Sequence, residues 1–107
     1  MKNILVVKKL PAAGMALFPF ILVKYESLKK DIVIINHERI HLRQQIELLI
    51  LPFYILYLLN YLINLLRFQN HDLAYRNIIF EKEAYTYETD LTYLKKGNWF
   101  GWLRMKF

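Results

Sequence analysis

The sequence has no cysteine and only three glycines and three prolines among its 107 residues. Without cysteine the chain has neither a disulfide framework nor a thiolate metal site, so any metal would be bound by histidine and carboxylate side chains. The scarcity of glycine and proline, with a hydrophobic fraction of 56%, excludes a disordered chain. This length favours one domain with a thin core.

Acidic residues are also scarce, since 9 Asp and Glu face 15 Lys and Arg and give a net charge of +6. Such a charge favours an anionic partner or serves solubility alone. The basic residues are scattered and no nucleic-acid-binding motif is present, so we expect no nucleic-acid partner. The apolar content exceeds what a small soluble domain can bury, which points to a membrane surface or a second subunit.

The N-terminal region superficially resembles the start of a signal peptide. Pro11 and Pro19 interrupt its apolar part, and no small-residue cleavage site precedes Lys24. We therefore expect no cleaved signal peptide and a location that is membrane-associated or cytoplasmic.

Residues 1–35 predict a small antiparallel sheet, and the whole chain an α+β fold. Segment 4–7 is a short apolar run, and 16–23 and 32–35 are β-branched or aromatic runs separated by a polar turn. Pro19 places the second strand at a sheet edge.

Helices are predicted after the sheet. Asn36 is a suitable N-cap for a helix over 36–51, and Pro52 predicts a kink or break before an apolar helix over 53–68. Asp72 is a candidate cap for a helix over 73–94. A basic, aromatic tail over 95–107 follows.

Residues 37–41 read H-E-R-I-H, an H-E-x-x-H motif. On a helix, positions i and i+4 share a face, so His37 and His41 can bind one Zn²⁺. Glu38 lies about 100° around the helix from His37, where a general base for a zinc-bound water is needed. The alternative is a surface helix on which these side chains merely pair.

Zinc in a catalytic site needs a third protein ligand and an open position for water. The candidates later in the chain are His71, Asp72, Glu81, Glu83 and Glu88. A third histidine six residues after His41 is absent, because Glu47 stands there. Glu81 and Glu83 lie about 200° apart on a helix, so only one can face the site, and periodicity does not decide which.

The two motifs together, H-E-x-x-H at 37–41 and F-E-x-x-A at 80–84, resemble the gluzincin metallopeptidases of the HtpX type, and most closely their single-domain relatives, the minigluzincins. The likeness covers about 32–87 and implies that Glu81 is the third ligand. The Asp of the family's E-x-x-A-D pattern falls on Tyr85, which leaves open what supports a ligand there. The chain also resembles small bacterial proteins with N-H-E-x-x-H-x-R-Q-Q and F-E-x-E-A-Y segments, which imply no function.

The gluzincin resemblance implies a small sheet packed on the zinc helix, with an edge strand, 16–23 or 32–35, that binds an extended peptide. A group that stabilises the transition state is also needed near the metal. The candidates for that group or for orienting a ligand are Tyr75, Arg76, Tyr85 and His71.

Segment 48–66 carries no charge and approaches the length that crosses a bilayer. A single complete crossing would place His41 and Glu81 on opposite sides of the membrane, about 30 Å apart. If Glu81 is a ligand, the segment must fold back, lie in the interface or pack against another subunit.

The leading functional hypothesis is a zinc-dependent metallopeptidase that hydrolyses peptide bonds, with Glu38 assisting a zinc-bound water. The alternative is a non-catalytic, membrane-associated interaction protein with an incidental or structural metal site. The tail at 95–107 suits a membrane-surface anchor, an ordinary packed terminus or a cover over the cleft.

Overall fold

The computed structural model describes residues 3–97 and 99–105, and its fold is α+β as expected. The strands are β1 (Ile4–Val6), β2 (Gly14–Leu17) and β3 (Phe20–Val23). The α-helices are α1 (Ile32–Glu47), α2 (Leu51–Phe68), α3 (His71–Arg76) and α4 (Ile79–Tyr87). Short 3-10 helices cover Glu26–Lys30, Leu94–Lys96 and Gly101–Arg104.

The sheet has the order β1-β3-β2 and is mixed rather than antiparallel. β2 and β3 pair antiparallel, whereas β1 runs parallel to β3. The prediction of one strand over 16–23 was wrong, because the chain reverses between Leu17 and Phe20 through a cis Phe18–Pro19 bond. Pro19 therefore lies in a turn, where its missing N–H costs no ladder bond.

Segment 32–35 was predicted as a strand and is instead the first turn of α1. The Asp31 carboxylate accepts hydrogen bonds from the backbone N–H groups of Val33 and Ile34, both at 3.1 Å, so the helix starts before the predicted cap. This β-branched turn is helical because Ile35 packs into the sheet's core. That core contains Ile4, Ile21, Val23 and Ile35.

Asn36 is therefore inside α1 and not its cap. Its side-chain Nδ2 donates to the backbone carbonyls of Tyr87, Glu88 and Asp90, at 3.2, 2.8 and 3.1 Å. This amide ties α1 to the end of α4.

The break expected at Pro52 is confirmed, although α1 ends at Glu47 rather than at 51. Pro52 lies in the first turn of α2, a position that needs no backbone N–H. α2 ends where Gln69 adopts a left-handed conformation with φ 52°.

The prediction of one helix over 73–94 was wrong, because α3 and α4 are separate helices. α3 is capped by Asn70 rather than Asp72, since the Asn70 side chain accepts from the Leu73 N–H at 3.1 Å. The N-terminus of α4 is capped from another helix, because Asn60 Oδ1 on α2 accepts from the Ile79 N–H at 2.9 Å. Local sequence patterns do not reveal such a cap.

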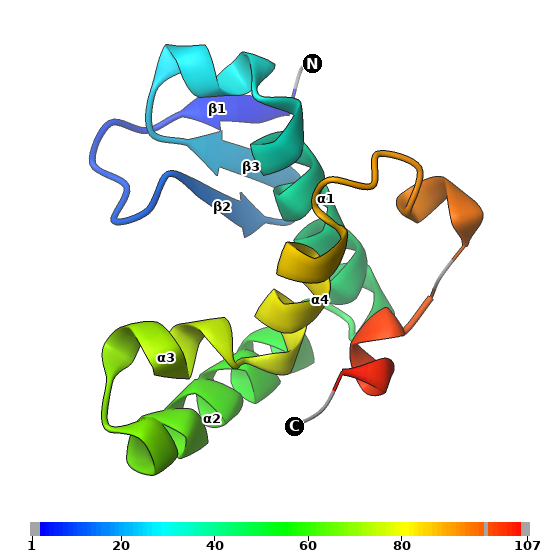
Figure 1. Cartoon of the computed structure of the whole chain (residues 1–107). Helices are drawn as coiled ribbons and strands as arrows, with labels where there is room; N and C mark the ends of the chain where they lie inside the picture. The colour runs from blue at the N-terminus through cyan, green and yellow to red at the C-terminus, as the bar shows by residue number, and fades with distance from the viewer. Residues whose placement is uncertain (1–2, 98, 106–107) are drawn as a thin grey trace.

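The elements are arranged along α1 (Figure 1). The sheet packs near the start of α1, α4 lies beside α1, and the α2–α3 hairpin projects from the end of α1 opposite the sheet. The tail returns to the end of α1, where the Glu47 carboxylate accepts from the Phe100 N–H at 2.5 Å and from Trp102 Nε1 at 3.0 Å. The parts of the predicted tail at 98 and 106–107 lie outside the described residues.

Candidate metal centre

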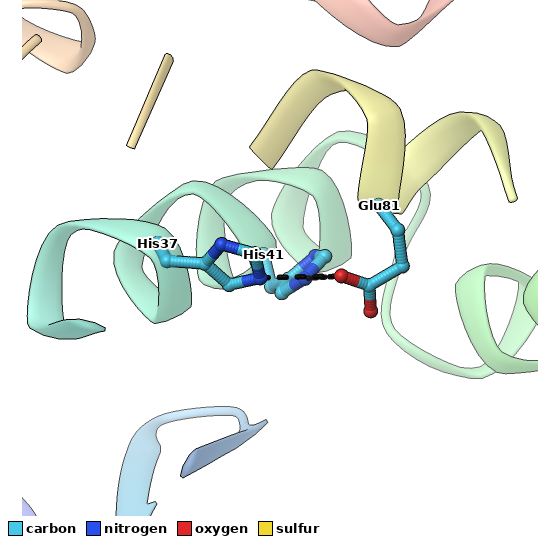
Figure 2. Close-up of side chains that lie close together, drawn as sticks. All are labelled: His37, His41 and Glu81. Carbon is cyan, nitrogen blue, oxygen red and sulfur yellow. Dashed lines mark hydrogen bonds and ion pairs between the residues drawn. The ribbon is translucent and has the colours of Figure 1, made fainter. Parts of the chain in front are cut away.

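The H-E-x-x-H motif lies on α1 with both histidines buried, and Glu81 lies in the first turn of α4. Glu81 Oε1 is 3.2 Å from His37 Nε2 and 3.0 Å from His41 Nε2. Figure 2 shows the three side chains pointing toward one another from the two helices. Their ligand atoms all lie within 4.8 Å of each other, which is the arrangement one metal ion requires.

The other ring nitrogen of each histidine has its own partner. His37 Nδ1 is 2.7 Å from Glu88 Oε1, and His41 Nδ1 is 2.7 Å from Gln44 Oε1. Gln44 is itself oriented, since its Nε2 donates to the Phe80 carbonyl at 3.0 Å and to Glu83 Oε1 at 2.7 Å. Both acceptors place the ring proton on Nδ1, so the Nε2 lone pairs face the site.

Two imidazole lone pairs and a carboxylate oxygen therefore converge in a buried space. Three acceptors that face each other need a cation between them, either a proton or a metal ion. Burial would lower the pKa of His41, but the Glu81 carboxylate outweighs it and raises that pKa to about 9. The donor set of two histidines and one glutamate is one that catalytic zinc uses, so these residues fit zinc.

Glu38 lies beside the ligands and is only 7% exposed. Burial raises the pKa of its carboxyl, and the nearby His41 and His37 oppose the shift. Gly14 of β2 lies directly above it, because a Cβ added to Gly14 would be 3.1 Å from Glu38 Oε2. Glycine thus lets the strand approach this carboxylate closely.

Two cavities meet at Glu38. The first, of about 210 Å³, lies between β2 and α2, and its lining includes Ala16, Leu17, Phe53, Tyr57 and Glu81. The second, of about 230 Å³, is more polar, and its lining includes His37, Tyr75, Tyr85 and Glu88. Gly14 and Glu38 border both cavities, so together they form a cleft along the edge strand β2. No residue of 95–97 or 99–105 lines either cavity, which leaves the described parts of the tail away from the cleft.

Of the four residues predicted to support the site, three lie at or beside it and one lies outside it. Tyr75 borders both cavities, and burial with the nearby Glu81 raises the pKa of its phenol, so it remains a proton donor. Tyr85 packs edge-on against His37, with ring centroids 4.6 Å apart. Arg76 lies over the Tyr85 ring, with its Cζ 5.2 Å from the ring centroid. His71 lies outside the site, where its Nδ1 is 2.7 Å from the Tyr61 hydroxyl.

Glu83, the alternative ligand, lies elsewhere. Besides Gln44, its carboxylate accepts from the Tyr93 hydroxyl at 2.5 Å. Gly101 covers this pair, since a Cβ there would clash with both Glu83 and Tyr93. The carboxylate is thus separated from the ligand atoms by Gln44, and it supports that side chain.

Sequence reasoning missed three supporting contacts. Gln44 follows His41 by three residues, a spacing on one helix face that could have indicated it. The contact of Glu88 with His37 had a weaker indication, because Glu88 shares a face with Glu81 on a continuous helix. No sequence pattern indicated the contact of Tyr57, because its hydroxyl reaches from α2 to donate to Glu81 Oε2 at 2.5 Å.

No protein-family model, curated protein or solved structure matches the chain.

Proposed function

We propose that this chain is a zinc-dependent metallopeptidase of the gluzincin type. The observation that carries the proposal is the buried convergence of His37, His41 and Glu81 beside Glu38 in a cleft. When bound there, zinc would polarise the scissile carbonyl and make water a competent nucleophile near neutral pH.

Glu38 is the proposed general base. Its carboxylate accepts a proton from the attacking water on one oxygen and then passes that proton to the leaving amine. Because burial raises the pKa of Glu38, the carboxylate is a better proton acceptor than an exposed one. Tyr75 stays protonated and borders the cleft, so it is the proposed hydrogen-bond donor to the oxyanion that develops on the substrate.

The edge strand β2 is the proposed binding site for the peptide substrate. The Lys24 N–H donates to the Ala13 carbonyl, and this bond with the β2–β3 register directs the Gly14 and Ala16 peptide groups away from β3. Gln45 Nε2 and the Tyr54 hydroxyl donate to the Ala16 carbonyl, at 2.9 and 3.1 Å. An extended substrate would thus pair with Gly14, above Glu38.

The contacts outside the ligands have a proposed positioning role. Glu88 supports His37, and in this proposal it replaces the family's Asp as the support of a ligand, since the position of that Asp is Tyr85 here. Gln44 does the same for His41, and Tyr57 holds the second oxygen of Glu81. Such partners fix ring orientation and raise ligand basicity.

The alternative function, a non-catalytic membrane-associated protein with a structural metal, shares the metal site. It assigns no role to Glu38 or to the cleft. A buried carboxylate bordering two cavities next to the ligands favours the enzyme.

The test is Glu38→Gln in zinc-loaded protein, assayed against a broad peptide library. We expect zinc content to be retained and cleavage to fall by roughly 10²–10⁴-fold. Glu26→Gln is the matched control, because that side chain is 78% exposed and lines neither cavity. Unchanged cleavage in Glu38→Gln would exclude it as the base, and zinc-loaded wild type that cleaves nothing would favour the alternative.

A further inference from the structure

Helix α2 exposes its apolar side chains and buries its polar ones, the reverse of a surface helix in a soluble protein. Its outer face carries eight leucine and isoleucine side chains, each at least 42% exposed. They are Leu51, Ile55, Leu56, Leu58, Leu59, Leu62, Ile63 and Leu66. Among the described residues, α2 is the one helix whose length and composition would suffice to cross a membrane, and only 17% of its 18 residues are buried.

The inner face of the same helix is where its polar groups lie. Asn60 caps α4, and Asn64 Nδ2 donates to the Ala74 carbonyl at the end of α3 at 3.1 Å. The tyrosines of α2 also point inward, since Tyr57 reaches Glu81 and Tyr61 reaches His71. In water a helix of this kind would turn the asparagines outward and the leucines inward.

The reversed polarity suits a lipid environment. Outside the aqueous phase, backbone groups at helix breaks must be satisfied internally, and Asn60 and Asn64 do this for α3 and α4. The outer face offers only hydrocarbon, with no side-chain donor or acceptor to orient a protein partner. Between Glu47 and Asp72 the only side chain with a permanent charge is Arg67, at the end of α2, which suits anionic headgroups.

The helix cannot cross the bilayer. His41 precedes α2 and Glu81 follows it, and they lie 3.0 Å apart. α3 also keeps an exposed ion pair beside α2, with Arg76 Nε 3.5 Å from the Asp72 carboxylate. A bilayer that covers this face can therefore only meet α2 along its length, with the helix lying in the membrane surface.

We propose that the outer face of α2 docks in the plane of an anionic lipid bilayer. The Phe53 and Tyr57 side chains that line the first cavity project from the opposite face of α2. Docking would therefore leave the cleft open while holding it at the membrane surface. This surface is independent of the proposed catalysis.

Flotation with vesicles of phosphatidylcholine and phosphatidylglycerol tests the docking. Wild type should float with these vesicles and less with phosphatidylcholine alone. Leu59→Glu should lower partitioning into the vesicles roughly tenfold or more, because the substitution removes one buried leucine side chain from the hydrocarbon. Leu91→Glu is the matched control, since Leu91 is 48% exposed and Leu59 is 50% exposed, but Leu91 lies outside α2. Circular dichroism checks that both variants fold.

The absence of cysteine allows a second measurement that does not depend on a charge substitution. A spin label at Leu62→Cys should become more accessible to oxygen when anionic vesicles are added, whereas one at Leu91→Cys should not. The proposal is overturned if wild type does not float with anionic vesicles. It is also overturned if sedimentation shows a dimer that Leu59→Glu dissociates while vesicles bind neither form. Because the readouts are binding and depth, either failure would leave the proposed peptidase activity untouched.

Discussion

Helices α1 and α2 depart from the usual burial rule in opposite ways. α1 buries charged and polar side chains, among them His37, Glu38 and Gln44, whereas α2 exposes a row of leucines and isoleucines. Both departures cost free energy in water unless hydrogen bonds, a bound cation or a covering surface compensate for them.

The geometry of each departure indicates what compensates for it. The buried groups of α1 converge with Glu81 on one point, which fits a single cation. The exposed groups of α2 extend along a helix as a continuous apolar face, which fits an extended surface such as lipid. Three predictions test this contrast.

The largest effect is expected at the convergence point. Glu81→Ala should remove the carboxylate ligand and lower zinc affinity by more than the roughly 10–100-fold typical of losing an outer partner. Glu83→Ala is the comparison, since Glu83 contacts Gln44 and not the ligand atoms, and its loss should stay within that smaller range. Chelator competition measures both affinities. Metal loss in Glu83→Ala with retention in Glu81→Ala would assign the ligand to Glu83.

The next effect is the pH dependence of zinc binding. The pKa of His41 is raised from 6.5 to about 9 in the metal-free fold, so below pH 9 this ring carries a proton that zinc must displace. Affinity should therefore rise about tenfold per pH unit, or roughly a hundredfold from pH 6 to pH 8. Titrations on the Glu38→Gln background remove the contribution of the neighbouring carboxyl. A flat profile would mean that His41 binds no proton against Glu81.

The smallest effect compares the two faces of α2 without lipid. Asn64→Leu should lower the free energy of unfolding by about 1–3 kcal/mol, because the Ala74 carbonyl loses its donor. Leu58→Ser on the outer face should change it by less than about 0.5 kcal/mol. Urea unfolding at a fixed zinc concentration measures both. An equal loss in Leu58→Ser would show that the outer face is covered by protein in solution.

The sequence alone determined the features that depend on local spacing. The i, i+4 periodicity of a helix was enough to pair His37 with His41 and to place Glu38 beside them. Pro52 was enough to predict the helix break, because its ring tolerates only the first turn. The uncharged segment 48–66 was enough to predict an apolar helix, and to predict that this helix does not simply cross a membrane if Glu81 is a ligand.

Tertiary structure decided what depends on partners distant in the chain. Segment 32–35 is helical because Asp31 caps it and Ile35 packs on the sheet, which outweighs the strand preference of β-branched residues. Glu81 and Glu83 were equivalent by periodicity. In the structure the histidines contact Glu81, whereas Gln44 and Tyr93 donate to Glu83. The separation of α3 from α4 depends on Asn60 of α2, a capping group that no local pattern reveals.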